Sequence, residues 1–280
     1  MRNHVFATLA IGSALAVGAG GALAGGGPEP GVMQGGRGIE HGSIRYVAVS
    51  AGARTVIEEI RRSDAMVVRF SSLNGNWGVP IVAFDGTTGG LLPSGHMLVL
   101  GEVSTRAGLR TRSSFALIDT RNLRLVRTIR LAGDFSFDAL APDGSYLYLI
   151  EHVSSRVLSR YRVRAYDLGA RKLLARVIVD KREWEPTMRG WPLTRATSTD
   201  GSWVYTLYGG TGKSFIHALD ARAAGAVCID LPWPKQPGRL YELKLALRDD
   251  GHLVVRGPNG RTLAVVDHKT FRVLSSVSDP

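Results

Sequence analysis

The stretch LAPDGSYLYLI (140–150) decides the fold, because it joins a turn signal to a strand that is apolar on both faces. Asp-Gly favours a tight turn, since Gly takes positive φ without steric cost and the Asp side chain can bond the turn backbone. The same phrase recurs, imperfectly, at LLPSGHMLVL (91–100), TSTDGSWVYTL (197–207) and LRDDGHLVV (247–255). The chain is therefore built from repeated units.

Each copy continues into an apolar run that ends in Asp. The turn glycines lie at positions 95, 144, 201 and 251 and the closing aspartates at 119, 167, 220 and 267, so the period is about 50 residues. A unit of four strands that is apolar on both faces must stack against neighbours. The pattern predicts an all-β β-propeller with about five four-stranded blades, or six if the long connections contain strands.

The opening unit and the acidic turn residues complete this interpretation. Three strands are predicted at 44–50, 55–62 and 66–73, without the innermost strand that the later units have. We expect Asp143, Asp200 and Asp250 to hold turns rather than to act in catalysis.

The PDG turn, the run YLYLI and a third strand closed by Asp and followed by a basic residue (Asp119-Thr120-Arg121, Asp267-His268-Lys269) resemble the YVTN/WD40-like β-propeller repeats of secreted bacterial proteins. The resemblance covers about residues 79–278, although the Tyr-Val-Thr-Asn tetrad and the Trp-Asp pair are missing. It implies a scaffold and carries over no catalytic residues.

The beginning of the chain has the pattern of a secretory signal peptide. Arg2 and His4 precede an apolar run too short to span a bilayer, and Ala22-Leu23-Ala24 fits a cleavage site. We predict a signal peptide over 1–24 cleaved after Ala24, a flexible Gly/Pro-rich leader over 25–42, and one propeller domain over 43–280. The mature chain should be secreted, monomeric and without a transmembrane segment.

The net charge of +11 either draws the protein to anionic surfaces or only keeps it soluble. The expected partner is an anionic envelope polymer, a small polar ligand or a protein, and no motif for nucleic acid, a cofactor or a metal is present. The single Cys228 cannot form an internal disulfide, and it is expected to pack as a small hydrophobe rather than to serve as a reactive thiol.

The longest connection, DKREWEPTMRGW (180–191), combines guanidinium donors with flat aromatic rings. Arg binds oxyanions in bidentate fashion and Trp stacks on apolar ring faces, so this rim suits a polar or anionic ligand. The predicted ligand-binding residues are Arg182, Trp184, Arg189, Trp191, Arg195 and His152. The alternative is that the tryptophans serve as packing.

Two further groups of charged residues each have two interpretations. Arg160, Arg162 and Arg164 alternate along one strand, as either a solvated face or an anion-binding wall. Asp85, Asp138 and Glu151 would be the acid/base candidates if the protein were a hydrolase or lyase acting on a sugar or ester, with Arg195 as electrostatic stabiliser. Counted from the turns, Asp138 and Arg195 occupy equivalent inner-strand positions and would otherwise neutralise each other. A strand over 79–86 is expected to open the second unit, and Asp85 within it follows the same phrasing. Binding is favoured over catalysis, and convergence of two carboxylates in one pocket would reverse that preference.

Overall fold

The computed structural model describes residues 30–104, 108–180, 182, 186–210, 212–233 and 237–277. The predicted signal peptide and its cleavage site lie outside this part. Within it, no helix is both long and apolar enough to cross a membrane.

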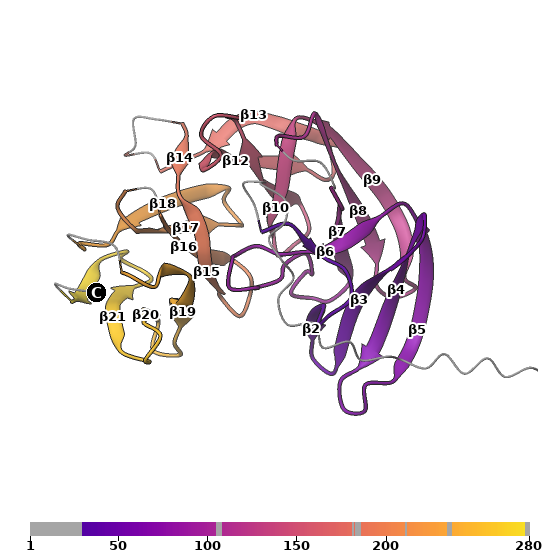
Figure 1. Ribbon diagram of the computed structural model, residues 1–280, viewed down its shortest axis with the longest axis horizontal. Helices are drawn as coiled ribbons and strands as arrows, with labels where there is room; N and C mark the ends of the chain where they lie inside the picture. Colours follow the sequence, from indigo (N-terminus) through magenta and orange to yellow (C-terminus); the bar gives the residue numbers. More distant parts are fainter. Residues whose placement is uncertain are drawn as a thin grey trace, which may run out of the picture.

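The described residues form five antiparallel sheets (Figure 1). The first sheet contains β2 (Ile39–His41), β3 (Ile44–Ala51), β4 (Arg54–Arg61) and β5 (Val67–Asn74). The second contains β1 (Val32–Met33), β6 (Trp77–Pro80), β7 (Met97–Glu102), β8 (Arg112–Asp119) and β9 (Arg124–Ala132). The third contains β10 (Asp134–Leu140), β11 (Tyr146–His152), β12 (Arg160–Asp167) and β13 (Lys172–Ile178), with β14 (Met188–Arg189) paired to β12. The fourth contains β15 (Trp191–Thr197), β16 (Trp203–Gly209), β17 (Phe215–Asp220) and β18 (Gly225–Asp230). The fifth contains β19 (Lys244–Leu247), β20 (His252–Arg256), β21 (Thr262–Asp267) and β22 (Val273–Ser276), preceded by a 3-10 turn, η1 (Leu240–Glu242).

Apolar side chains on both faces of each sheet explain why the sheets stack. Four hydrophobic clusters join the first sheet to the second, the second to the third, the third to the fourth and the fourth to the fifth. In the described part of the chain, no such cluster joins the fifth sheet to the first. Figure 1 shows these two sheets, yellow and indigo, at opposite ends of an arc. The all-β prediction with five sheets is confirmed, and the arc is not closed into a ring.

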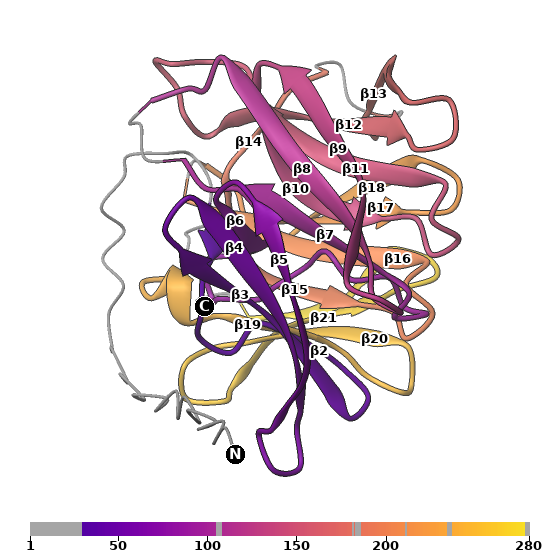
Figure 2. The same ribbon diagram turned by 90° about the vertical axis from the view of Figure 1, so that its right-hand side faces the viewer.

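Among the described residues, the first sheet consequently has a face without a neighbouring sheet, and this face is toward the viewer in Figure 2. Phe70 on β5 is 70% exposed, in keeping with this open position. The other face of the sheet packs Ile57 against β7 residues of the second sheet.

The predicted turn residues act as scaffold. The turn glycines Gly95, Gly144, Gly201 and Gly251 all have positive φ, between 69° and 80°. Asp143, Asp200 and Asp250 each accept the backbone N–H of the residue two positions later. The closing aspartates likewise accept backbone N–H groups of the next hairpin turn.

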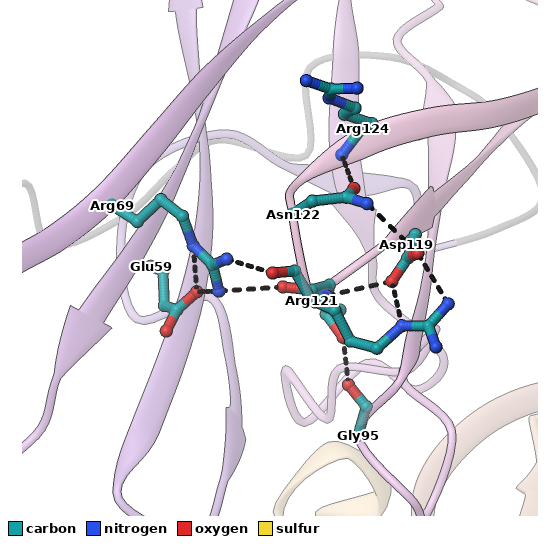
Figure 3. Close-up of polar contacts among 8 residues, drawn as sticks. Glu59, Arg69, Gly95, Asp119, Arg121, Asn122 and Arg124 are labelled. Atoms are coloured by element: carbon teal, nitrogen blue, oxygen red, sulfur yellow. Dashed lines mark hydrogen bonds and ion pairs between the residues drawn. The ribbon is translucent and has the colours of Figure 1, made fainter.

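One such turn also connects two sheets (Figure 3). Asp119 accepts the N–H of Arg121 at 3.0 Å and shapes the turn between β8 and β9. Arg69 on β5, held by an ion pair with Glu59, donates to the carbonyl oxygens of Thr120 and Arg121. The first sheet is thereby attached to a turn of the second by polar as well as apolar contacts.

The prediction of a flexible leader over 25–42 is wrong for the part that the structure describes. β1 pairs with β6, and β2 forms the strand of the first sheet that the sequence analysis did not find. The glycines here serve tight backbone geometry, because a Cβ at Gly38 (φ 59°) would lie 2.0 Å from the carbonyl oxygen of Tyr46. Glycine content was interpreted as disorder, whereas it marks close approach of two backbones.

The predicted strand at 79–86 is also corrected. β6 ends at Pro80, and residues 81–91 cross the centre of the arc. There the N–H groups of Phe84 and Asp85 donate to the carbonyl oxygens of Pro192 and Leu193, at 2.8 and 3.1 Å. Asp85 thus lies on a central loop, not on an inner strand.

Candidate functional site

Buried polar side chains gather between the third and fourth sheets. The strand register places Arg195, Thr206, His217 and Cys228 in one row across β15, β16, β17 and β18. Directly opposite residues of antiparallel strands share a face, and this face packs against the third sheet. The row therefore forms the polar part of an otherwise apolar interface.

Arg195 and Asp138 form an ion pair at the centre of this interface. Their side chains are only 6% and 4% exposed. Arg195 donates to the carboxylate and the backbone oxygen of Asp138, and also to Oγ1 of Thr206 at 2.9 Å. The two side chains therefore neutralise each other, which is one of the two roles that the sequence suggested for them. Most hydrogen-bond donors of the Arg195 guanidinium are already used, so few are left for a ligand.

His217 lies in the same row with one ring nitrogen unsatisfied. It is 2% exposed, and its Nε2 has no hydrogen-bond partner among the described residues. The pKa of His217 is lowered to about 4, chiefly by burial; Arg195 contributes to this lowering, while Asp138 and Asp180 oppose it. The imidazole is therefore neutral at physiological pH.

This neutral histidine predicts a stability that falls in mild acid. Above pH 6.5 neither the folded nor the unfolded protein protonates His217, but between pH 6.5 and about 4 only the unfolded chain takes up the proton. The free energy of unfolding should fall by about 2 kcal/mol between pH 7 and pH 5 from this group alone. Urea unfolding at the two pH values, with chelator present, measures the change. His217→Gln should remove most of it and exposed His96→Gln should not; equal losses in the wild type and His217→Gln would contradict the assignment.

A small cavity opens beside the ion pair. It has a volume of about 20 Å³, and its lining includes Asp138, Arg195, His152 and Tyr208. That space suits about one water molecule. Nε2 of His152 is 2.8 Å from Oγ of Ser136, so this predicted ligand-binding residue lies in a buried hydrogen-bonded position.

The structure separates the other predicted rim residues. Arg182 is exposed but forms an ion pair with Asp180 and donates to the carbonyl oxygen of Cys228 at 3.0 Å. Trp191 is half-buried against Phe84, with ring centroids 6.1 Å apart. Trp184 lies outside the described residues.

Arg189 is exposed and makes no hydrogen bond or ion pair through its side chain with any described residue. It is paired across β14 and β12 with Arg160, and Nε of Arg160 donates to Oγ1 of Thr187 at 3.1 Å. The neighbouring pair, Met188 and Tyr161, faces the fourth sheet, so Arg189 and Arg160 face the other way. Arg189 and Arg195 therefore do not share one site.

The three acid/base candidates have separate partners. Asp85 accepts hydrogen bonds from Thr87 and lies 3.4 Å from Nζ of Lys244. Burial would raise the pKa of Asp85, but hydrogen bonds from Thr87 and Thr194 lower it below its ordinary value. Glu151 forms an ion pair with Arg164 at 2.7 Å. Of the three, only Asp138 lines the cavity described above, so that cavity gives no support to a carboxylate pair.

Sequence analysis missed the aromatic and histidine part of this interface. Tyr161 and Tyr208 stack with ring centroids 5.1 Å apart, and Tyr208 meets the His217 ring edge-on at 6.4 Å. A polar residue in the middle of the apolar run FIHALD was the available signal. Within the described ranges, no three or more His, Cys, Asp and Glu side chains are placed to share a metal ion.

Comparisons with known proteins concern the fold. No protein-family model and no curated protein matches the chain. Among solved structures, the chain is similar to hydrazine synthase of Kuenenia stuttgartiensis, with 17% identity, 81% of this chain and 68% of that chain covered, and a TM-score of 0.51. It is also similar to the β-propeller domain of Cps50 (Swd1) from Myceliophteria thermophila, with 13% identity, coverages of 91% and 70%, and a TM-score of 0.46. TolB of Acinetobacter baumannii is 13% identical, with coverages of 79% and 50% and a TM-score of 0.42, so the chain spans half of that protein. Of these three, the hydrazine synthase likeness has a TM-score above 0.5, and at 17% identity it shows a similar fold alone.

Proposed function

We propose that this protein is an exported β-propeller module that binds a polar or anionic ligand at the rim beside the 180–195 connection. The single observation that carries the proposal is the pairing of Arg189 with Arg160 across β14 and β12. Opposite residues of an antiparallel pair have Cβ atoms about 5 Å apart, and like charges at such positions repel each other. A phosphate or carboxylate held by the Arg189 guanidinium would lower that repulsion.

Three further features support the proposal. Arg162 lies on the same face of β12 two residues beyond Arg160, so the positive charge continues along the strand. Arg189 is exposed and can reach a ligand without breaking an internal contact with a described residue. The net charge of +11 raises the local concentration of anions around the whole molecule. We further propose that the ligand is an anionic envelope polymer and that the protein acts in the secreted, extracytoplasmic state.

Thermal unfolding in the presence of phosphates, sugar acids and neutral sugars tests this function. An anion that binds only the native state at a hundredfold excess over Kd should stabilise it by about 2.7 kcal/mol. Arg189→Ala should remove most of that stabilisation. Arg124→Ala is the matched control, because Arg124 is also exposed but lies on the outer strand β9 of another sheet.

The same ligands should lose affinity as salt increases, since exposed charges are screened. No shift with any anion, or equal shifts in Arg189→Ala and the wild type, would refute anion binding at this rim.

A further inference from the structure

A cysteine, a methionine and a histidine meet where the edges of the third and fourth sheets come together. Met188 on β14 and Cys228 on β18 have their sulfur atoms, Sδ and Sγ, 4.0 Å apart. His217 on β17 lies directly opposite Cys228 in the strand register, on the same face of the fourth sheet. Three side chains that commonly bind metals are therefore adjacent, and none of the roles described above uses them.

The histidine gives this contact its significance. His217 is only 2% exposed, and its Nε2 lacks a hydrogen-bond partner in the described part of the chain. A buried polar atom without a partner is costly, so native proteins rarely retain one that has no use. The Tyr208 ring lies edge-on to His217, and His217 lies opposite Cys228 in the strand register. The imidazole and the thiol thus border the same small region.

We propose that Cys228, Met188 and His217 bind a soft monovalent cation, Cu(I) or its redox-inert analogue Ag(I). Thiolate and thioether sulfur are soft ligands that favour Cu(I), and neutral imidazole suits copper as well. Two metal–sulfur bonds of about 2.3 Å spanning the observed separation of 4.0 Å would meet at an angle of about 120°. A planar three-coordinate site then has its third position for the nitrogen of His217.

Charge and access agree with this assignment. A thiolate and a monovalent cation together are neutral, which limits the cost of placing them in a buried interface. Cys228 is half-buried rather than fully enclosed, on β18 at the edge of its sheet, and Asp180 and Arg182 contact its backbone there. Its backbone N–H donates to the buried Asp180 at 2.8 Å, which fixes the strand at this residue. On binding, the thiol releases one proton to solvent, a sulfur–metal bond forms, and no electron is transferred.

Anaerobic titration of the reduced protein with Cu(I) buffered by bicinchoninate tests the site. We expect one Cu(I) per chain and the ultraviolet absorption of a thiolate–metal bond. Cys228→Ser should abolish both signals, and Met188→Leu should weaken binding by at least about tenfold. Met97→Leu is the matched control, because Met97 is a partly buried methionine of the second sheet, and its affinity should equal that of the wild type.

Several outcomes would overturn the proposal. Withdrawal of no copper from the indicator by the wild type would refute the site, and so would one equivalent of copper retained by Cys228→Ser, because the ion then binds elsewhere. Far-ultraviolet circular dichroism and the melting temperature of each variant establish that it is folded. If Met188→Leu does not fold, Ag(I) titration of the wild type with X-ray absorption decides the matter, since it must show two sulfur ligands and one nitrogen ligand. A first shell of one sulfur only would refute the site.

Discussion

Replacing Arg195 with alanine should lower the free energy of unfolding by about 3–5 kcal/mol, because it leaves the carboxylate of Asp138 buried without a cation. Asp138 is 4% exposed, and Arg195 donates to both its carboxylate and its backbone oxygen. Urea unfolding followed by circular dichroism measures the change. From the sequence, Arg195 was predicted to bind a ligand at the rim. Its removal would then weaken ligand binding and leave the stability unchanged.

Two comparisons separate a buried-charge effect from a general loss of an arginine. Arg222→Ala removes a partner of Asp200 where both side chains are more than half exposed, so it should cost less than about 1 kcal/mol. The double variant Asp138→Leu/Arg195→Met removes both charges and should recover most of the lost stability. If the double variant is no more stable than Arg195→Ala, the loss does not come from an unpaired carboxylate.

The outcome for these two residues shows what a repeat alignment can predict. Counting from the turn glycines put Asp138 and Arg195 at equal distances from their turns and named mutual neutralisation as one possibility, which their ion pair confirms. The strand registers differ, because the irregularity lies at Asp138 in β10 and at Leu193 in β15. The same counting failed for Asp85, because the chain leaves β6 at Pro80 and crosses to β15 instead of continuing as a strand. Local turn chemistry is encoded locally, whereas the path of a long connection depends on contacts with segments more than 100 residues away.

A second repeated feature of the turns cannot be recognised in the sequence, because it is a backbone conformation. Four residues after each closing aspartate, the backbone takes a positive φ of 51–58° at residues that are not glycine: Leu123, Arg171, Ala224 and Phe271. These residue types share no side-chain property, so no sequence motif could reveal the position. The aspartate that precedes them holds the turn through its backbone hydrogen bonds, and it was the part visible in the sequence.

Among the four repeated turn glycines, replacement of Gly201 with alanine should lower the free energy of unfolding most. Gly144→Ala is the variant with which it is compared. Both glycines occupy the same turn position, with φ of 69° and 74°, so both alanines carry a backbone strain of about 1–2 kcal/mol. A Cβ at Gly144 would lie no closer than 3.6 Å to Leu92, but a Cβ at Gly201 would lie 2.4 Å from Cγ of Pro93. Overpacking against a rigid ring adds about 1–3 kcal/mol, so Gly201→Ala should be the less stable variant by that amount.

This difference tests the arrangement of the sheets as well as one turn. Pro93 belongs to the turn of the second sheet and Gly201 to that of the fourth, so their contact exists only because the arc brings non-adjacent sheets together across its centre. Pro93→Ala removes the ring and should restore Gly201→Ala to the stability of Gly144→Ala when the variants are compared by urea unfolding. Equal destabilisation by the two glycine substitutions, with no rescue by Pro93→Ala, would mean that these turns do not meet, and the curvature of the arc would then be wrong.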